Sequence, residues 1–165
     1  MPDSPLRLAL YQPDIPQNTG TMLRACACLG VAASIIEPAG FALSDKHFRR
    51  AGMDYLNEVA LLRHASFADF MVWRAQMQAE RGGHRLLLLT TQGATKYTDF
   101  AFAKGDILMV GRESAGVPAS VHALADARLK IEIAPQMRSL NVALSAAMVL
   151  GEALRQFAIQ ERSEC

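Results

Sequence analysis

The chain has 165 residues, of which 51% are hydrophobic and 20% charged, and 17 Lys and Arg against 16 Asp and Glu give a net charge of +1. This composition excludes a disordered chain, and the length suits one compact domain spanning residues 1–165. The balanced charge also excludes a basic surface over the whole molecule, so a nucleic acid would have to bind a local patch.

The first part of the chain predicts a strand, a helix, a second strand and a short polar helix. Residues 6–11 form a brief apolar run that prolines terminate, as expected for a buried strand followed by a loop. Asn18 is the expected N-cap of a helix whose apolar residues recur with helical spacing, and Gly30 ends that helix. The second strand and the short helix are predicted at residues 32–36 and 45–50.

The rest of the chain continues this alternation. Further strands are predicted at residues 59–63, 86–89, 107–110 and 129–133, with 86–89 in the centre of the sheet. Helices are predicted at residues 67–80 and from about 141 to 160. Between these two, Pro118 suits the first turn of a further helix. The order predicts an α/β domain with a mainly parallel sheet flanked by helices.

The last predicted helix opens with an apolar run, residues 142–151, that leaves it with almost no polar face. Small residues recur along it, at Ala143, Ala146, Ala147 and Gly151, so it should be buried nearly all round. A small domain can hardly enclose such a helix alone, which predicts a subunit interface. The uncharged apolar stretch, residues 142–151, is much shorter than the roughly 20 residues that cross a bilayer, so we expect no membrane span.

The amino terminus and the cysteines indicate a cytoplasmic protein. An acid and several prolines stand where a signal peptide would have a basic start and an apolar segment. Cys26, Cys28 and Cys165 are an odd number, and the Cys-x-Cys pair lacks the second ligand pair of a zinc site. We therefore expect buried free thiols in a reducing compartment and no metal.

Three polar segments each follow a predicted strand, which is where open α/β sheets place their ligands. In the first segment, Gly20 and Arg24 share a helix face away from the apolar stripe. Bare backbone beside a guanidinium could then receive a phosphate or a ribose. The alternative is that Asn18 only caps the helix and Arg24 is a solvated charge.

The other two segments offer a tight turn and a helix start. Two glycines in residues 111–118 permit a turn with Glu113 at its tip, which matches neither a dinucleotide fingerprint nor a Walker loop. A purely structural turn is the alternative. Ser139 or Asn141 can cap the last helix, whose free N–H groups favour an anion or an electron-rich ligand atom.

Together these segments resemble the three motifs of the SPOUT RNA 2′-O-methyltransferases, in the same order: Asn18-Thr-Gly20 with Arg24, Gly111-x-Glu113-x-x-Gly116-x-Pro118, and Ser139-Leu-Asn141 before a helix of small residues. The compact length and the stretches Ile35-Ile-Glu-Pro and Arg49-Arg-Ala-Gly-x-Asp-Tyr55 are similar to the branch that methylates the wobble ribose of tRNA. The resemblance covers nearly the whole chain. It implies a carboxy-terminal trefoil knot (the SPOUT, or α/β-knot, fold) and a homodimer with composite active sites.

The resemblance also implies the reaction and its residues. A methyl group would pass from S-adenosyl-L-methionine to the 2′-hydroxyl of the wobble cytidine or modified uridine of leucine tRNAs, leaving S-adenosyl-L-homocysteine. The positions that hold the methyl donor are Leu89, Gly111, Ile133 and Ser139, and the positions around the attacking ribose are Arg24, Asn18, Glu113 and Asn141. Because a guanidinium stays protonated at neutral pH, we do not expect Arg24 to act as a base. Two roles remain: a fixed cation that stabilises the developing alkoxide, or a group that polarises the hydroxyl while an RNA phosphate or water accepts the proton.

Contacts with the tRNA anticodon stem-loop are expected from basic residues, namely Lys46, Arg49, Arg50 and Arg138. A solvated helix face is the alternative for Arg49 and Arg50. Two other functions remain open: 2′-O-methylation of ribosomal RNA, and a non-catalytic RNA-binding knot protein. The joint presence of Arg24, Glu113, Ser139 and Asn141 argues against the second.

Overall fold

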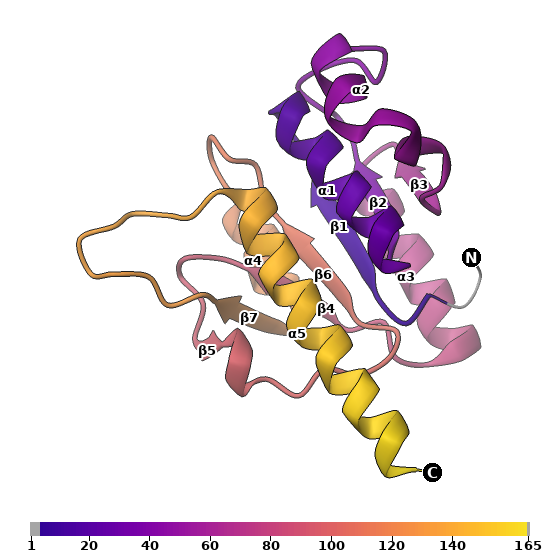
Figure 1. The fold of residues 1–165 in the computed structure, drawn as a ribbon, viewed down its shortest axis with the longest axis vertical. Helices are drawn as coiled ribbons and strands as arrows, with labels where there is room; N and C mark the ends of the chain where they lie inside the picture. Colours follow the sequence, from indigo (N-terminus) through magenta and orange to yellow (C-terminus); the bar gives the residue numbers. More distant parts are fainter. Residues whose placement is uncertain (1–3, 165) are drawn as a thin grey trace.

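The computed structural model describes residues 4–164 and has a seven-stranded sheet between two layers of helices (Figure 1). The strand order is β3-β2-β1-β6-β4-β7-β5, and each neighbouring pair is parallel. The strands are β1 (Arg7–Tyr11), β2 (Ala32–Ile36), β3 (Leu61–His64), β4 (Leu86–Leu89), β5 (Thr95–Lys96), β6 (Ile107–Val110) and β7 (Ala127–Lys130). The α/β architecture expected from the sequence is confirmed.

Helices alternate with most of the strands, and the last helix follows the final strand. They are α1 (Pro16–Leu29), α2 (Lys46–Gly52), α3 (Phe67–Arg81), α4 (Ala119–Leu124) and α5 (Val142–Ser163), with short 3₁₀ helices η1 (Met53–Asn57) and η2 (Tyr97–Asp99). Asp45 caps the start of α2: its carboxylate accepts the N–H groups of His47 and Phe48. Aspartate is one of the residues that favour this position.

Side chains that alternate along each central strand form two cores. In β1, Leu8 and Leu10 enter the core packed by α1, α2 and α5, whereas Ala9 and Tyr11 enter the core that contains Phe70 of α3 and Val121 of α4. The same alternation holds in β4 and β6. Because both faces are covered, these strands are continuous apolar runs apart from Arg7 at the start of β1.

The start of α1 differs from the prediction. The helix begins at Pro16, the N-cap position is Ile15, and no side chain caps it, so the predicted capping role of Asn18 is wrong. Proline suits a first helical turn because it has no N–H to leave unpaired. Asn18 therefore sits inside the first turn, where its side chain is free to make other contacts. The predicted end at Gly30 is confirmed by its left-handed φ of 66°.

Helix α5 is buried on one side only, in contrast to the predicted burial all round. Val149, Leu150 and Ala153 pack in the core beside the sheet. An exposed strip, here called the α5 outer face, is formed by Leu144, Ala147, Met148, Gly151, Arg155 and Ile159. By length and hydropathy α5 is the one helix within residues 4–164 that could cross a membrane. Its inner side is already covered by the sheet, which is typical of a core helix.

Several helix and strand boundaries differ from the predicted ones. β3 covers residues 61–64 and β7 covers 127–130, so Ile133 lies beyond its strand, and the two-residue β5 was not expected. Pro118 is the N-cap of α4 and precedes its first turn.

The two described cysteines differ in burial. Cys26 is buried, which raises the pKa of its thiol to about 12, but Cys28 is exposed, contrary to expectation. Cys165 lies outside the described residues.

Candidate active site

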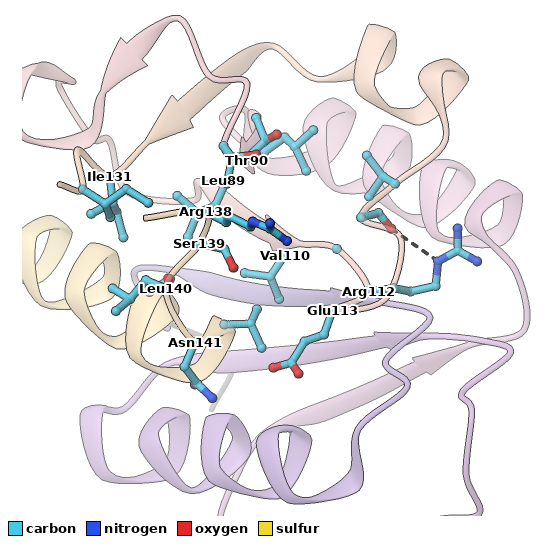
Figure 2. A pocket seen from close by; sticks show the side chains of 18 residues that line it. Leu89, Thr90, Val110, Arg112, Glu113, Ile131, Arg138, Ser139, Leu140 and Asn141 are labelled. Carbon is cyan, nitrogen blue, oxygen red and sulfur yellow. Dashed lines mark hydrogen bonds between the residues drawn. The ribbon is translucent and has the colours of Figure 1, made fainter. Parts of the chain in front are cut away.

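A cavity of about 440 Å³ lies where the carboxyl ends of β4 and β6 meet the segment after β7 and the start of α5 (Figure 2). The pocket is lined at the end of β4 by Leu89 and Thr90, and after β6 by Gly111, Glu113 and Val117. The segment before α5 contributes Ile131, Ile133, Arg138, Ser139, Leu140 and Asn141. This volume falls within the range of small-molecule sites, roughly 300–1,000 Å³. The pocket also has the location that open parallel sheets favour for ligands.

The pocket combines apolar walls with a few polar groups. Leu89, Val110, Ile131 and Leu140 line it with hydrocarbon, and the hydroxyls of Thr90 and Ser139 lie among them (Figure 2). A flat aromatic or heterocyclic ring suits such walls, and the few polar groups would fix its orientation.

The turn after β6 depends on its two glycines. Arg112 and Gly116 exchange backbone hydrogen bonds of 3.1 and 2.8 Å, which closes a tight loop. A Cβ at Gly111 would lie 2.8 Å from the Gly116 carbonyl carbon, and Gly116 has a φ of 60°. Both positions therefore favour glycine, one for space and one for conformation. The backbone of this turn forms one side of the pocket.

A chain of side-chain hydrogen bonds joins all three polar segments. The Asn18 amide donates to the Glu113 carboxylate, and the Asn141 amide donates to the Asn18 carbonyl oxygen at 3.2 Å. The Asn141 carbonyl oxygen accepts the N–H groups of Ala143 and Leu144 at 2.9 and 3.2 Å, so the predicted Asn141 cap of α5 is confirmed. These hydrogen bonds hold the three segments in fixed positions around the pocket.

Glu113 supplies the carboxylate in this series of hydrogen bonds. Partial burial raises the pKa of its carboxyl, and the nearby Asp14 carboxylate raises it further. The Val142 N–H and the Asn18 amide act in the opposite direction without cancelling the rise. In Figure 2 the Glu113 side chain points toward Asn141 at the base of the pocket.

The Arg24 side chain lies against η1 and outside the pocket. Its guanidinium stands 4.8 Å from the Tyr55 ring centroid and donates to the Met53 sulfur at 3.3 Å, both in η1. Within the described chain it is not one of the pocket's lining residues. The expectation of bare backbone at Gly20 is wrong, because α2 covers it: a Cβ there would lie 2.5 Å from the Phe48 carbonyl oxygen. Glycine is needed there for helix packing.

The basic residues fall into two groups. Lys46, Arg49 and Arg50 are exposed on α2. Arg138, by contrast, lines the pocket, and its side chain extends across the opening in Figure 2. The Arg112 guanidinium projects away from the cavity, with Nε donating to the Gly116 carbonyl at 3.3 Å. Arg138 is thus placed to contact a ligand in the pocket.

The structure brings most predicted site residues together. Those that line one pocket are Leu89, Gly111, Glu113, Ile133, Arg138, Ser139 and Asn141, with Asn18 bonded to two of them. Sequence reasoning missed Thr90, Ile131 and Leu140, although each adjoins a residue or strand that was predicted. In residues 4–164, no three His, Cys, Asp or Glu side chains cluster in a way that could hold a metal ion.

Taken together, these features define a ligand-binding α/β protein with a preformed pocket at the carboxyl edge of its sheet. Residues 5–151 match the SpoU rRNA Methylase family, and the chain belongs to this family.

Similar proteins cover nearly the whole chain. It is 67% identical over 149 residues to the tRNA (cytidine(34)-2′-O)-methyltransferase of Beijerinckia indica, covering 90% of each protein. It is 42% identical over 153 residues to the enzyme of that name from Escherichia coli K12, covering 92% and 93%.

Two solved structures are also similar to this chain in fold. One, from work on 2-OH methylation of C/U34 on tRNA, has a TM-score of 0.85 at 39% identity and covers 96% of this chain and 99% of its own. The methyltransferase AviRb from Streptomyces viridochromogenes in complex with AdoMet has a TM-score of 0.86 at 27% identity, covering 94% and 62%.

Proposed function

We propose that this protein transfers a methyl group from S-adenosyl-L-methionine to the ribose 2′-hydroxyl of nucleotide 34 in tRNA. The observation that carries the proposal is the 67% identity, over 90% of both chains, to a tRNA (cytidine(34)-2′-O)-methyltransferase. A preformed pocket at the carboxyl edge of the sheet supports it. The wobble nucleotide would be cytidine or a modified uridine, and we expect leucine tRNAs to be substrates.

The pocket fits the methyl donor chemically. Leu89, Ile131, Ile133 and Leu140 offer apolar walls for the adenine ring, and the backbone at Leu89 and Gly111 offers hydrogen bonds to its polar edge. Ser139 is placed to bind a polar part of the same molecule. When bound, S-adenosyl-L-methionine supplies a positively charged sulfonium whose methyl group is open to attack by an oxygen nucleophile.

The residues of this chain would contribute position and charge. Oxygen attack on a sulfonium methyl consumes charge, so a site that excludes water and aligns the reacting atoms has a large effect. We assign Arg24 to the attacking ribose, where its guanidinium stabilises the developing alkoxide or polarises the hydroxyl. Asn18, Glu113 and Asn141 would hold the surrounding loops through the hydrogen bonds described above.

Two copies of the chain would form each active site. The α5 outer face exposes 58% of Leu144 and 41% of Met148, an apolar strip that a second copy would bury. Arg24 does not line its own pocket in the described chain, which agrees with an arginine supplied by the partner subunit. We further propose one domain, because both cores share a single sheet, and a carboxy-terminal trefoil knot, as the family implies.

The RNA would lie across α2 and the pocket mouth. Lys46, Arg49 and Arg50 form an exposed basic face on α2, and Arg138 extends over the cavity. Such cations bind phosphates regardless of a balanced total charge. We therefore propose that these four residues contact the anticodon stem-loop. The protein would act in the cytoplasm, without a metal ion.

The test is to incubate the protein with labelled S-adenosyl-L-methionine and total tRNA, then locate the methyl group by mass spectrometry. A 2′-O-methyl group on nucleotide 34 is the expected result. No incorporation, or methylation of another nucleotide, would contradict the proposal. Arg24→Lys is the informative variant: it should still bind the methyl donor but lose most turnover, because an ammonium lacks the guanidinium fork.

A further inference from the structure

Asp14 lies between β1 and α1, and is not among the described residues that line the pocket. Its carboxylate nevertheless holds the turn that does. Oδ1 accepts the Glu113 N–H at 3.1 Å, and Oδ2 accepts the Ser114 N–H at 3.3 Å together with the Ser114 hydroxyl. Two consecutive backbone N–H groups and a hydroxyl thus converge on one side chain, at the tip of the loop closed by Arg112 and Gly116.

Asp14 is itself held from behind by the segment after β2. The Gly40 N–H donates to the Pro13 carbonyl oxygen at 2.8 Å. A Cβ on Gly40 would lie 3.0 Å from the Asp14 Cα and 3.2 Å from its Cβ, so the two segments touch through bare backbone. The backbone at Asp14 is therefore packed against the segment after β2, while the Asp14 carboxylate holds the exposed loop tip.

The charge of Asp14 strengthens this attachment. Partial burial alone would raise the pKa of its carboxyl, but the Ser114 hydroxyl and the Glu113 and Ser114 N–H groups outweigh it and keep the pKa below its ordinary value. Asp14 is therefore ionised at neutral pH. Hydrogen bonds to an ionised acceptor are roughly twice as strong as neutral ones.

We propose that Asp14 is a positioning residue for the methyl transfer: it sets the loop of residues 111–116 so that Gly111 faces the methyl donor and Glu113 reaches Asn18. The inference rests on the proposed function. Without Asp14 the tip N–H groups return to water, and the Glu113–Asn18–Asn141 chain loses its anchor at the Glu113 end. The pocket wall and the helix start that Asn141 caps would then no longer be held in register.

Two variants and a matched control test this role. Asp14→Ala removes all three acceptor contacts, and Asp14→Asn keeps the size and one acceptor oxygen. Ser66→Ala is the control, because it deletes a bond of 3.1 Å from the Asp69 N–H at the start of α3, away from the pocket-lining segments. Amide hydrogen exchange, calorimetric affinity for S-adenosyl-L-methionine without RNA, and kcat and KM on tRNA are measured for each.

Asp14→Ala should accelerate exchange at the Glu113 and Ser114 amides and weaken binding of S-adenosyl-L-methionine by roughly tenfold or more, with a lower kcat. Asp14→Asn should be intermediate and should lower the pKa of Glu113, seen by NMR of its carboxyl carbon, since a neighbouring negative charge is gone. Ser66→Ala should keep the affinity of the wild type. If Asp14→Ala does not fold, Asp14→Asn carries the test.

Two outcomes would overturn the inference: an Asp14→Ala protein with the affinity and kcat of Ser66→Ala, or an Asp14→Asn protein whose Glu113 and Ser114 amides exchange as slowly as those of the wild type. Failure of the proposed function is distinguishable, because the wild type itself would then leave tRNA unmethylated. Exchange at the Glu113 and Ser114 amides and affinity for S-adenosyl-L-methionine would still be measured without RNA.

Discussion

Asn141 both caps α5 and joins the hydrogen-bonded chain of the site, and substitution can separate these roles. Asn141→Ala removes the acceptor of the Ala143 and Leu144 N–H groups, bonds of 2.9 and 3.2 Å, and the donor to Asn18. Loss of the cap costs about 1 kcal/mol, and loss of an exposed hydrogen bond about 0.5 kcal/mol. For a chain of this size, we therefore expect Tm to fall by roughly 3–6 °C.

Asn141→Asp should behave differently. A carboxylate still accepts both N–H groups and is favoured at a helix N-terminus, so stability should stay within about 0.5 kcal/mol of the wild type. It cannot donate to Asn18, and it brings a second negative charge toward Glu113. Turnover should then fall in both variants, while only Asn141→Ala loses stability.

Thermal unfolding and methyl transfer at saturating substrates measure the two effects separately. An Asn141→Asp protein as unstable as Asn141→Ala would refute the capping argument. Full turnover by Asn141→Asp would refute a role for the Asn18–Asn141 bond in the reaction.

Two further predictions concern pH and salt. Burial and the nearby Arg7 lower the pKa of His64, and Asp69 opposes them with a smaller effect. As pH falls through about 6.5, His64 therefore takes up a proton more readily in the unfolded chain than in the folded one, and the free energy of unfolding decreases. In urea unfolding from pH 8 to pH 5, the His64→Gln protein should lose less stability than the wild type, and equal losses would contradict this. Replacing Arg49 and Arg50 with Gln should lower the slope of log K against log salt for tRNA binding by about 1–2, whereas an unchanged slope would remove these residues from the RNA surface.

Much of the fold follows from local patterns. The apolar runs of β1, β4 and β6 and the glycine that ends α1 are encoded in residues next to each other, so the sequence suffices to place them. β5 is only two residues long and carries no such pattern. The start of α1 was misplaced because Asn18 has the chemistry of a cap, while Pro16, two residues earlier, determines where the helix begins.

The site was predictable to the extent that its residues follow strands. Gly111, Ser139 and Asn141 each lie just beyond a strand or at a helix start, and the sheet brings them to one edge. Contacts that depend on tertiary approach were not predictable. Asp14 meets a turn about 100 residues away in the sequence, and Gly20 is covered by a helix that its own neighbours do not reveal.

The central claim is that each active site combines the pocket of one chain with Arg24 of the other, and complementation tests it most directly. Arg24→Ala and Ile133→Asp should each be inactive alone, the first without the guanidinium and the second with a charge in the apolar wall. When they are unfolded and refolded together, half of the dimers are mixed and each has one intact site, so roughly a quarter of the wild-type methylation of nucleotide 34 should return. If Arg24 serves the pocket of its own chain, the mixture will stay inactive.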